Sequence, residues 1–267
     1  MRHDSRATLP AMRLRVLTYN IHRAIGVDRR FRPQRIVEIV SHYAPDLVLL
    51  QEVDEGVPRS RELDLARELS SQLGFPHRAV GHNVSLRKGR YGNATLSRWP
   101  ILRERNIDLT VGPLKRRGCQ HTTLAVAEGV VLDVFNLHLG LSARERARQV
   151  GLLLGSDEMR GLHRAHPCLV GGDFNDWRSL LEPVLVEVFD FRCATRPPGF
   201  RSRALRTYPS FSPRGPLDRF YYRGPLRLLD CHAGRLRSAR LASDHLPVVA
   251  EFELSVPHAA RMSAPPE

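Results

Sequence analysis

The 267-residue sequence has few cysteines and no long hydrophobic run. No apolar stretch approaches the roughly 18 residues that a membrane span needs, and the opening MRHDSRATLPAMRLRVLTYN lacks the apolar core of a secretory signal. The cysteines lie far apart without a CxxC pair, which indicates neither a zinc site nor a disulfide framework. They are Cys119, Cys168, Cys193 and Cys231. We therefore expect a cytoplasmic protein with free thiols and no transmembrane segment.

The chain also lacks internal repeats, low-complexity blocks and long Gly/Ser or Pro linkers. Apolar residues make up 42% and charged residues 26%, a composition that favours a folded globular protein over disorder. Residues 1–13 and 255–267 mix charge, proline and small residues without periodicity, so we predict flexible tails there. A single domain is predicted over residues 14–254.

Acidic residues are scarce relative to basic ones. The chain has 28 Asp and Glu against 41 Lys and Arg, a formal net charge of +13, and most of the excess is arginine. The guanidinium fork suits phosphate oxygens, so an anionic partner is one interpretation. A basic surface that only keeps the protein soluble is the other, and charge alone leaves both open.

Alternating strand and helix patterns indicate an α/β layered domain. Helical periodicity predicts helices over 33–44, 60–74 and 142–161. A further helix is predicted over 178–189, capped by Asp176 with Trp177. A hairpin turning at Glu128–Gly129 makes the sheets partly antiparallel. Short apolar runs predict strands over 14–21, 46–53, 93–98, 122–128, 130–139, 167–174, 219–224 and 247–254.

Polar residues recur at the ends of these predicted strands, where a buried scaffold holds a side chain rigidly at a cleft. Each has an ordinary structural explanation when taken alone, such as a turn residue or a buried structural histidine. Together they supply hard oxygen ligands suited to Mg²⁺ or Mn²⁺ and two histidines for proton transfer, the groups that phosphoester hydrolysis requires. The set is Asn20, Glu52, His138, Asp173, Asn175, Asp218, Asp244 and His245.

Seven motifs, in order, resemble the endonuclease/exonuclease/phosphatase superfamily. They are TYNIH, LVLLQEVD, YGNATLSRWP, FNLHLG, VGGDFND, LDRFYY and SDHLPVV, and they extend over about residues 14–254. The resemblance implies a four-layered α/β sandwich of two packed mixed β-sheets flanked by helices. It also implies a divalent-metal site, for Mg²⁺ or Mn²⁺, at one edge of the sandwich.

The resemblance also implies roles for individual residues. Glu52 resembles the main metal ligand, with Asn20 and Asp244 helping to hold the metal and its waters. Asp173 resembles the group that positions or deprotonates the attacking water, and Asn175 resembles a donor to the phosphate.

The histidines take their expected roles from the same resemblance. Asp218 resembles the partner that orients His245, a dyad aimed at the scissile phosphate, and His138 resembles a second phosphate-facing histidine. An acidic partner for His138 is not evident in the sequence. Asp54 stands where pancreatic-type deoxyribonucleases carry an arginine, so the resemblance does not select that branch of the superfamily.

Three further residues, Asn93, Arg117 and Arg146, are predicted to contact substrate. Asn93 and Arg117 are candidates beside the motifs, although a turn residue and a solvated basic loop explain them equally well. Arg146 and Gln149 lie three residues apart on the predicted helix after HLGLS and share a face that could reach the site. The alternative is an ordinary surface helix with Arg144, Arg146 and Arg148 in solvent.

These observations predict a metal-dependent phosphodiester hydrolase, a nuclease acting on DNA or RNA by in-line attack of water. The alternative is a phosphatase or phosphodiesterase acting on a phospholipid headgroup or an inositol phosphate. A catalytically inactive binding scaffold is a third hypothesis, but no essential residue of the motif set is missing. We expect a monomer without a stable protein partner. The sequence leaves open strand preference, endo or exo mode and the number of metals.

Overall fold

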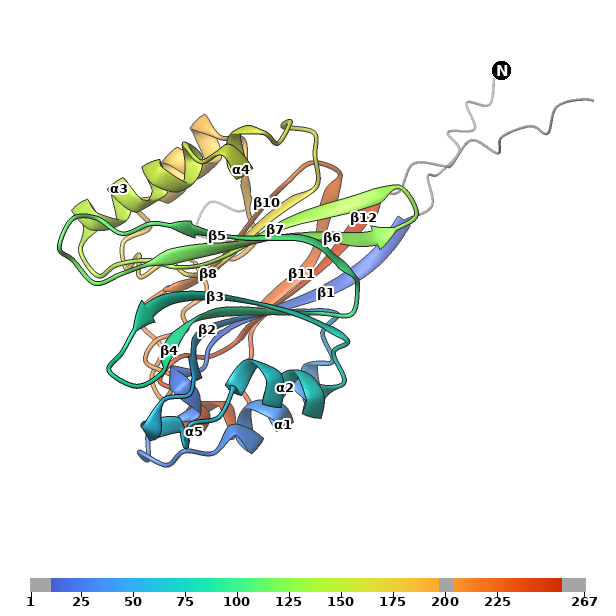
Figure 1. Cartoon of the computed structure of the whole chain (residues 1–267). Coiled ribbons are helices and arrows are strands. Elements are labelled where there is room, and N and C mark those ends of the chain that lie inside the picture. Colours follow the sequence, from blue (N-terminus) through green and yellow to red (C-terminus); the bar gives the residue numbers. More distant parts are fainter. Residues whose placement is uncertain (1–10, 197–203, 256–267) are drawn as a thin grey trace, which may run out of the picture.

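Two six-stranded mixed β-sheets pack face to face, with helices on both outer sides (Figure 1). This computed structural model describes residues 11–196 and 204–255. Helices α1, α2 and α5 lie outside one sheet, and α3 and α4 lie outside the other. The four-layered α/β sandwich that the resemblance implied is confirmed.

The first sheet has the strand order β11-β12-β1-β2-β4-β3. Its β1–β2 pair is parallel, and the other neighbours are antiparallel. The bounds are Ala11–Asn20 for β1, Leu47–Glu55 for β2, His77–Ser85 for β3, Arg90–Ser97 for β4, Leu226–Ala233 for β11 and Val248–Ser255 for β12.

The second sheet has the order β5-β6-β7-β8-β10-β9 and a parallel pair of its own, β7–β8. The β6–β7 hairpin turns at Gly129, whose φ of +66° suits glycine, as the sequence predicted. The bounds are Ile101–Asp108 for β5, Gly118–Ala127 for β6, Val130–His138 for β7, Cys168–Asp173 for β8, Arg192–Cys193 for β9 and Asp218–Arg223 for β10.

The helices differ from their predicted extents where the sequence supplies a stop or a cap. The predicted 142–161 helix is interrupted at Gly155–Ser156, and the 60–74 helix begins only at Leu65, after Asp64 caps it by accepting from the Arg67 N–H. The predicted 178–189 helix is reduced to a π-helical turn over Val184–Val188. The helices are α1 Pro33–Tyr43, α2 Leu65–Leu73, α3 Ala143–Leu154, α4 Asp157–Arg160 and α5 Ala239–Ala242.

All eight predicted strands are present, and four further strands were missed. The four missed strands, β3, β5, β9 and β11, are the edge strands of the two sheets. Strands β3, β5 and β9 carry many polar side chains and therefore contain no apolar run. Strand β1 starts at Ala11, so residues 11–13, which we assigned to a tail, pair with β12; Ser255, assigned to the other tail, is the last residue of β12. The predicted tails over 1–10 and 256–267 lie outside the described residues.

Apolar side chains fill three layers: one between the sheets and one between each sheet and its helices. Toward one edge, the layer between the sheets becomes polar. There the Gln51 amide donates to Asn136 Oδ1 at 2.8 Å, and the Asn136 amide donates to the carbonyls of Leu50 and Ala94. These hydrogen bonds tie the two sheets together beside the site described next, because buried polar groups need partners.

The described residues contain no helix both long and apolar enough to cross a membrane. All four cysteines are free, as predicted.

Candidate active site

The two parallel strand pairs end at the same edge of the sandwich. Asn20 lies at the end of β1, beside Gln51 of β2, and His138 of β7 is the register partner of Asp173 of β8. A cavity of about 270 Å³ opens between the sheets at this edge. The predicted residues that line it are Asn20, Glu52, Arg117, His138, Asp173, Asn175, Asp244 and His245. Residues far apart in sequence are thus brought to one cleft.

Glu52 faces the cavity because strand β2 is irregular at this point. The pairing of β2 with β4 shifts register between Leu50 and Val53, and Glu52 has a φ of +57°. A bulge of this kind redirects a side chain that regular alternation would place elsewhere. The Arg23 guanidinium lies 2.9 Å from Glu52 Oε2 and balances its charge.

Left-handed backbone gathers around the same cavity. His22, Arg23 and Ala24 form a left-handed turn with φ values of +45°, +61° and +57°, and Asn175 has a φ of +50°. Such conformations are costly for residues other than glycine and concentrate at functional sites. Part of the support is local, because the His22 N–H donates to Asn20 Oδ1 and the Asn175 N–H donates to Asp173 Oδ1.

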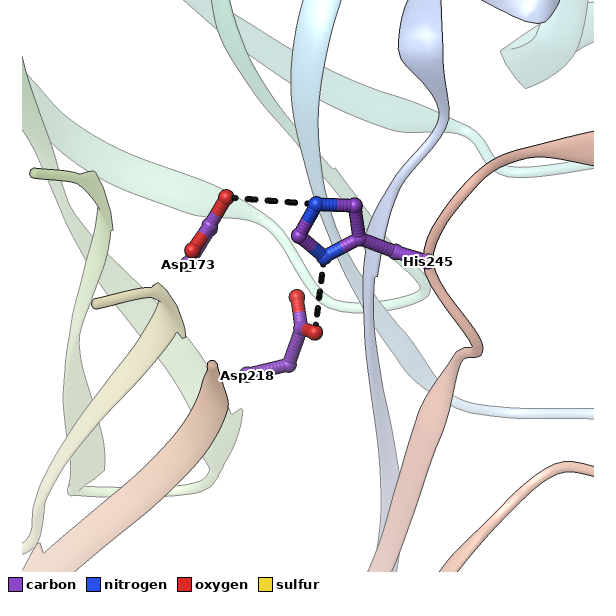
Figure 2. Close-up of side chains that lie close together, drawn as sticks. All are labelled: Asp173, Asp218 and His245. Atoms are coloured by element: carbon purple, nitrogen blue, oxygen red, sulfur yellow. Dashed lines mark hydrogen bonds and ion pairs between the residues drawn. The ribbon is translucent and has the colours of Figure 1, made fainter. Parts of the chain in front are cut away.

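His245 lies between two carboxylates (Figure 2). Its Nδ1 hydrogen-bonds to Asp218 Oδ2 at 2.9 Å, and its Nε2 lies 3.7 Å from Asp173 Oδ2. Burial alone would lower the pKa of His245, but the charges of Asp218 and Asp173 outweigh it and raise the pKa to about 10. The ring is therefore an imidazolium, and Asp218 lies behind it, where the predicted dyad requires it.

His138 is buried to the same extent, but its pKa is shifted in the opposite direction. Burial, followed by the positive charges of Arg117 and His245, holds its pKa well below the usual range. Its Nε2 lies 3.4 Å from Asp173 Oδ2. Asp173, a residue already in the motif set, is thus an acidic side chain that lies against His138.

Asp173 contacts several other residues of the site. Its Oδ2 accepts from the Asn20 amide at 3.1 Å and faces both histidines. Burial raises the pKa of Asp173 to about 6, although the charge of His245 opposes this. Asn175 also lines the cavity, and its amide donates to the Leu139 carbonyl at 2.9 Å.

The oxygen donors fit a hard divalent ion. Asn20, Glu52 and Asp244 all line the cavity, and carboxylate and amide oxygens are the ligands that Mg²⁺ and Mn²⁺ prefer. A second group, Asp173, Asp218 and His245, has ligand atoms within 4.8 Å of one another. Since both ring nitrogens of His245 already face carboxylates, that group serves the dyad, and the oxygen set is the better fit for a metal.

Cationic and aromatic side chains that the sequence did not single out form the remaining walls. Lys115 lies beside Arg117, whose buried Nε has no hydrogen-bond partner, and neither side chain pairs with a carboxylate among the described residues. On another side, Tyr208 packs against His245 with ring centroids 5.0 Å apart and against Trp177 at 5.6 Å. The loop positions of Lys115, Trp177 and Tyr208 gave no periodic signal, and only the quoted motifs beside them could have pointed there.

Asn93 does not line this cavity. It is buried between the sheets, and its amide donates to the carbonyls of Gly118 and Asn136. Its position indicates a link between the sheets rather than a substrate contact, because both partners are backbone groups.

Arg146 also lies outside the cavity lining. It shares a buried face with Gln149, so the solvated alternative is wrong for Arg146, whereas Arg144 and Arg148 are exposed. Its guanidinium donates to the Leu141 carbonyl at 2.6 Å, and Gln149 Oε1 accepts from the Gly140 N–H. Both residues hold the loop after His138 in place. Asp176, which we predicted to be a cap, accepts from the Leu181 N–H at 2.9 Å.

Comparison with known proteins identifies the architecture. The model of the Endonuclease/Exonuclease/phosphatase family matches residues 17–245. The chain belongs to this family. Its members are phosphoester hydrolases that typically use divalent metals, in agreement with the acid-rich, cation-lined cavity.

Relatives cover nearly the whole chain. The uncharacterized protein YbhP of Escherichia coli (strain K12) is 33% identical over 250 residues, which cover 90% of this chain and 96% of YbhP. A family member from Beutenbergia cavernae has a similar solved structure, with a TM-score of 0.74, 21% identity and coverage of 91% of this chain and 72% of that one. A mannosyl-6-phosphatase of Bacteroides thetaiotaomicron aligns with a TM-score of 0.69 at 18% identity, over 90% of this chain and 99% of that one.

Proposed function

We propose that the protein is a divalent-metal-dependent nuclease that hydrolyses phosphodiester bonds of DNA or RNA by in-line attack of water. The observation that carries the proposal is the cavity itself. It combines oxygen donors for a metal, a buried imidazolium and the cations Lys115 and Arg117, which have no carboxylate partners among the described residues. Groups of this kind stabilise the negative charge that builds up on a phosphate under attack.

The positions of the side chains suggest their tasks. Asp173 accepts from Asn20 and lies at the centre of the cleft, where it would orient the attacking water and take its proton. His245, held by Asp218, would donate to a phosphate oxygen. Arg117, Lys115 and Asn175, which also line the cavity, would bind the remaining phosphate oxygens.

Glu52, Asn20 and Asp244 are the residues that would hold Mg²⁺ or Mn²⁺ in this cavity. When bound, the ion supplies Lewis-acid stabilisation of phosphate charge. Arg23, which pairs with one oxygen of Glu52, leaves the other oxygen of that carboxylate for a ligand bond.

A substrate panel with a metal-binding control tests the proposal. Purified protein with Mg²⁺ or Mn²⁺ should cleave single- or double-stranded DNA or RNA, and Glu52→Gln should abolish cleavage. Calorimetry should show that Glu52→Gln loses more than the roughly 10- to 100-fold in Mn²⁺ affinity that loss of an outer-shell partner costs. The matched control is Glu55→Gln on the same strand, because Glu55 pairs with Arg90 and His82 rather than facing the cavity. Intact nucleic acids with every metal would disprove the nuclease function.

The alternative is a phosphatase or phosphodiesterase that acts on a phospholipid headgroup or an inositol phosphate. The modest cavity volume of about 270 Å³ favours it, since a single small phosphoester fits such a space. The structural likeness to a mannosyl-6-phosphatase is consistent with small phosphoesters as family substrates. The same panel, extended to phospholipids and inositol phosphates, decides between the two: preferential hydrolysis of the small compounds would select this alternative.

A further inference from the structure

A second cavity, of about 390 Å³, lies beside the candidate active site. Its walls carry Arg206, Arg235 and Arg240, and its floor includes Ala204 and Leu246, which are both buried. We name it the arginine cavity. Three exposed guanidinium groups thus line one hollow from three separate segments of the chain.

Within the described part of the chain, none of these three arginines has a partner of opposite charge. Elsewhere, arginines lie against carboxylates, as Arg35 does with Asp28 and Arg59 with Asp54. Arg206, Arg235 and Arg240 form no ion pair with any carboxylate of residues 11–196 and 204–255. Like charges that converge on one hollow repel one another, and a bound anion relieves that repulsion.

The arginine cavity is lined by residues that neighbour those of the active site along the chain. Leu246 adjoins His245, and Arg206 precedes Tyr208 by two residues, a chain length of at most about 7 Å. The two segments are tied together, because the Ser210 N–H donates to the Asp244 carbonyl and the Ser210 hydroxyl donates to the Arg240 carbonyl at 3.1 Å. The distance between the two cavities is therefore set by ordered backbone.

Spacing and charge favour a substrate with several phosphates. A nucleic-acid strand carries one phosphate for about every 3.4 Å of helix axis, so a strand cleaved in one cavity presents further phosphates to the neighbouring one. A small phosphomonoester reaches only one of the two.

We propose that the arginine cavity is a second phosphate-binding subsite, which holds a phosphate of the same nucleic-acid strand beside the scissile one. This inference rests on the proposed nuclease function and extends it, since it assigns the protein a polynucleotide rather than a single phosphoester as substrate. Guanidinium groups bind phosphate oxygens through charge-assisted, often paired hydrogen bonds.

The first test separates the two cavities by substrate. The triple variant Arg206→Gln, Arg235→Gln, Arg240→Gln should lose about tenfold or more in kcat/KM on a single-stranded oligonucleotide, mainly through KM, as expected when a charge-assisted hydrogen bond is lost. Its rate on bis(p-nitrophenyl) phosphate, a diester with one phosphate, should stay within about twofold of wild type because that substrate spans only the first cavity. Equal losses on both substrates would overturn the proposal.

The second test measures binding without catalysis. In EDTA, the slope of log K against log salt for the oligonucleotide should fall by about 0.7 for each phosphate contact removed. The control triple Arg67→Gln, Arg148→Gln, Arg164→Gln removes the same charge from exposed positions away from both cavities and should leave the slope unchanged. Equal slopes in the two triples would mean that only net charge matters, which contradicts a subsite.

A conservative variant and a lipid arm complete the design. Arg240→Lys keeps the charge and should retain most of the oligonucleotide affinity that Arg240→Gln loses, even where the triple variant folds poorly. Binding to vesicles of anionic phospholipid, with no oligonucleotide binding, would overturn the proposal in favour of a membrane surface. A wild type that hydrolyses bis(p-nitrophenyl) phosphate but neither binds nor cleaves nucleic acid would instead disprove the proposed nuclease function.

Discussion

The two ends of the parallel pair β7–β8 carry clusters of the same residue types with different surroundings. At the carboxyl end, His138 and Asp173 are register partners beside the cavity; at the other end, Asp133 pairs in register with Cys168. Asp133 is buried and accepts from Thr123 at 2.7 Å, and it lies 2.5 Å from His121 Nε2 and 2.6 Å from His166 Nε2. We call these residues the Asp133 cluster.

The difference lies in the carboxylates and in the cavity beside them. Both carboxylate oxygens of Asp133 are engaged, although His121 Nδ1 of the same cluster is buried without a hydrogen-bond partner. At the active-site end, Asp218 Oδ1 is buried without a partner, and so is the Nε of Arg117, which lines the cavity. A buried carboxylate with both oxygens engaged stabilises a fold, while a buried polar group left unpaired beside an open cavity is available to a ligand. Contacts between histidine and aspartate therefore do not identify a catalytic site; an open cavity with unpaired groups does.

The largest expected effect is a difference in activity between substitutions at the two ends of β7–β8. Asp218→Asn should lower kcat/KM for the metal-dependent hydrolysis by about 10²-fold or more, because His245 loses the carboxylate that orients and charges it. Asp133→Asn, at the opposite end of the sheet, should leave kcat/KM within about twofold. Steady-state kinetics on the substrate found by the panel measures both. Similar losses in the two variants would show that the Asp133 cluster also supports catalysis.

A smaller effect concerns stability, where Asp133→Asn should be the more damaging of the two substitutions. In Asp133→Asn, one of the two carboxylate oxygens that His121 and His166 contact is replaced by an NH₂ group. The loss of this acceptor should lower the free energy of unfolding by about 1–3 kcal/mol. Asp218→Asn should cost less, because one oxygen of Asp218 is already unsatisfied and functional residues are often not optimal for stability. Urea denaturation of both variants compares them. A greater loss in Asp218→Asn would reverse the assignment of structural and functional ends.

The smallest effect concerns acid stability. Burial raises the pKa of Asp133, but hydrogen bonds from His121, Thr123 and His166 outweigh it, so the net pKa lies below the ordinary value of 3.8. Since the folded-state pKa is depressed, the ionised carboxylate stabilises the fold above pH 3.8, and this contribution disappears as pH falls through the lower folded-state value.

Thermal melts of wild type and Asp133→Asn across the acidic range test this sign. The difference in Tm should be largest near neutrality and should shrink as the pH falls below about 4. A difference that grows toward acid pH would contradict the depressed pKa.

Much of the fold followed from the sequence because its main signals are local. Apolar runs located eight strands, since burial on a pleated sheet leaves that pattern in any context. The polar edge strands were missed because their partners, not their own apolar content, make them strands. The sequence did not predict the break after Leu154, because the helical pattern continues across Gly155.

The sequence predicted which residues form the candidate site better than it predicted how they are arranged. The motif residues line the cavity or, like Asp218, stand directly behind it. The roles proposed for Asn93 and Arg146 did not match their positions, because a side chain's direction depends on which neighbouring carbonyls need a donor. Tyr208 and Lys115 lie in loops, where no periodicity reports an inward orientation.

The sequence by itself determined that this protein buries an α/β core and ends its central strands in carboxylates, amides and histidines. Only the tertiary structure decided what those groups do. The bulge at Glu52, the position of His245 between Asp173 and Asp218, and the opposite pKa shifts of two equally buried histidines all depend on contacts between distant segments. The charge state and the orientation of a side chain depend on the groups around it, and folding brings those groups together.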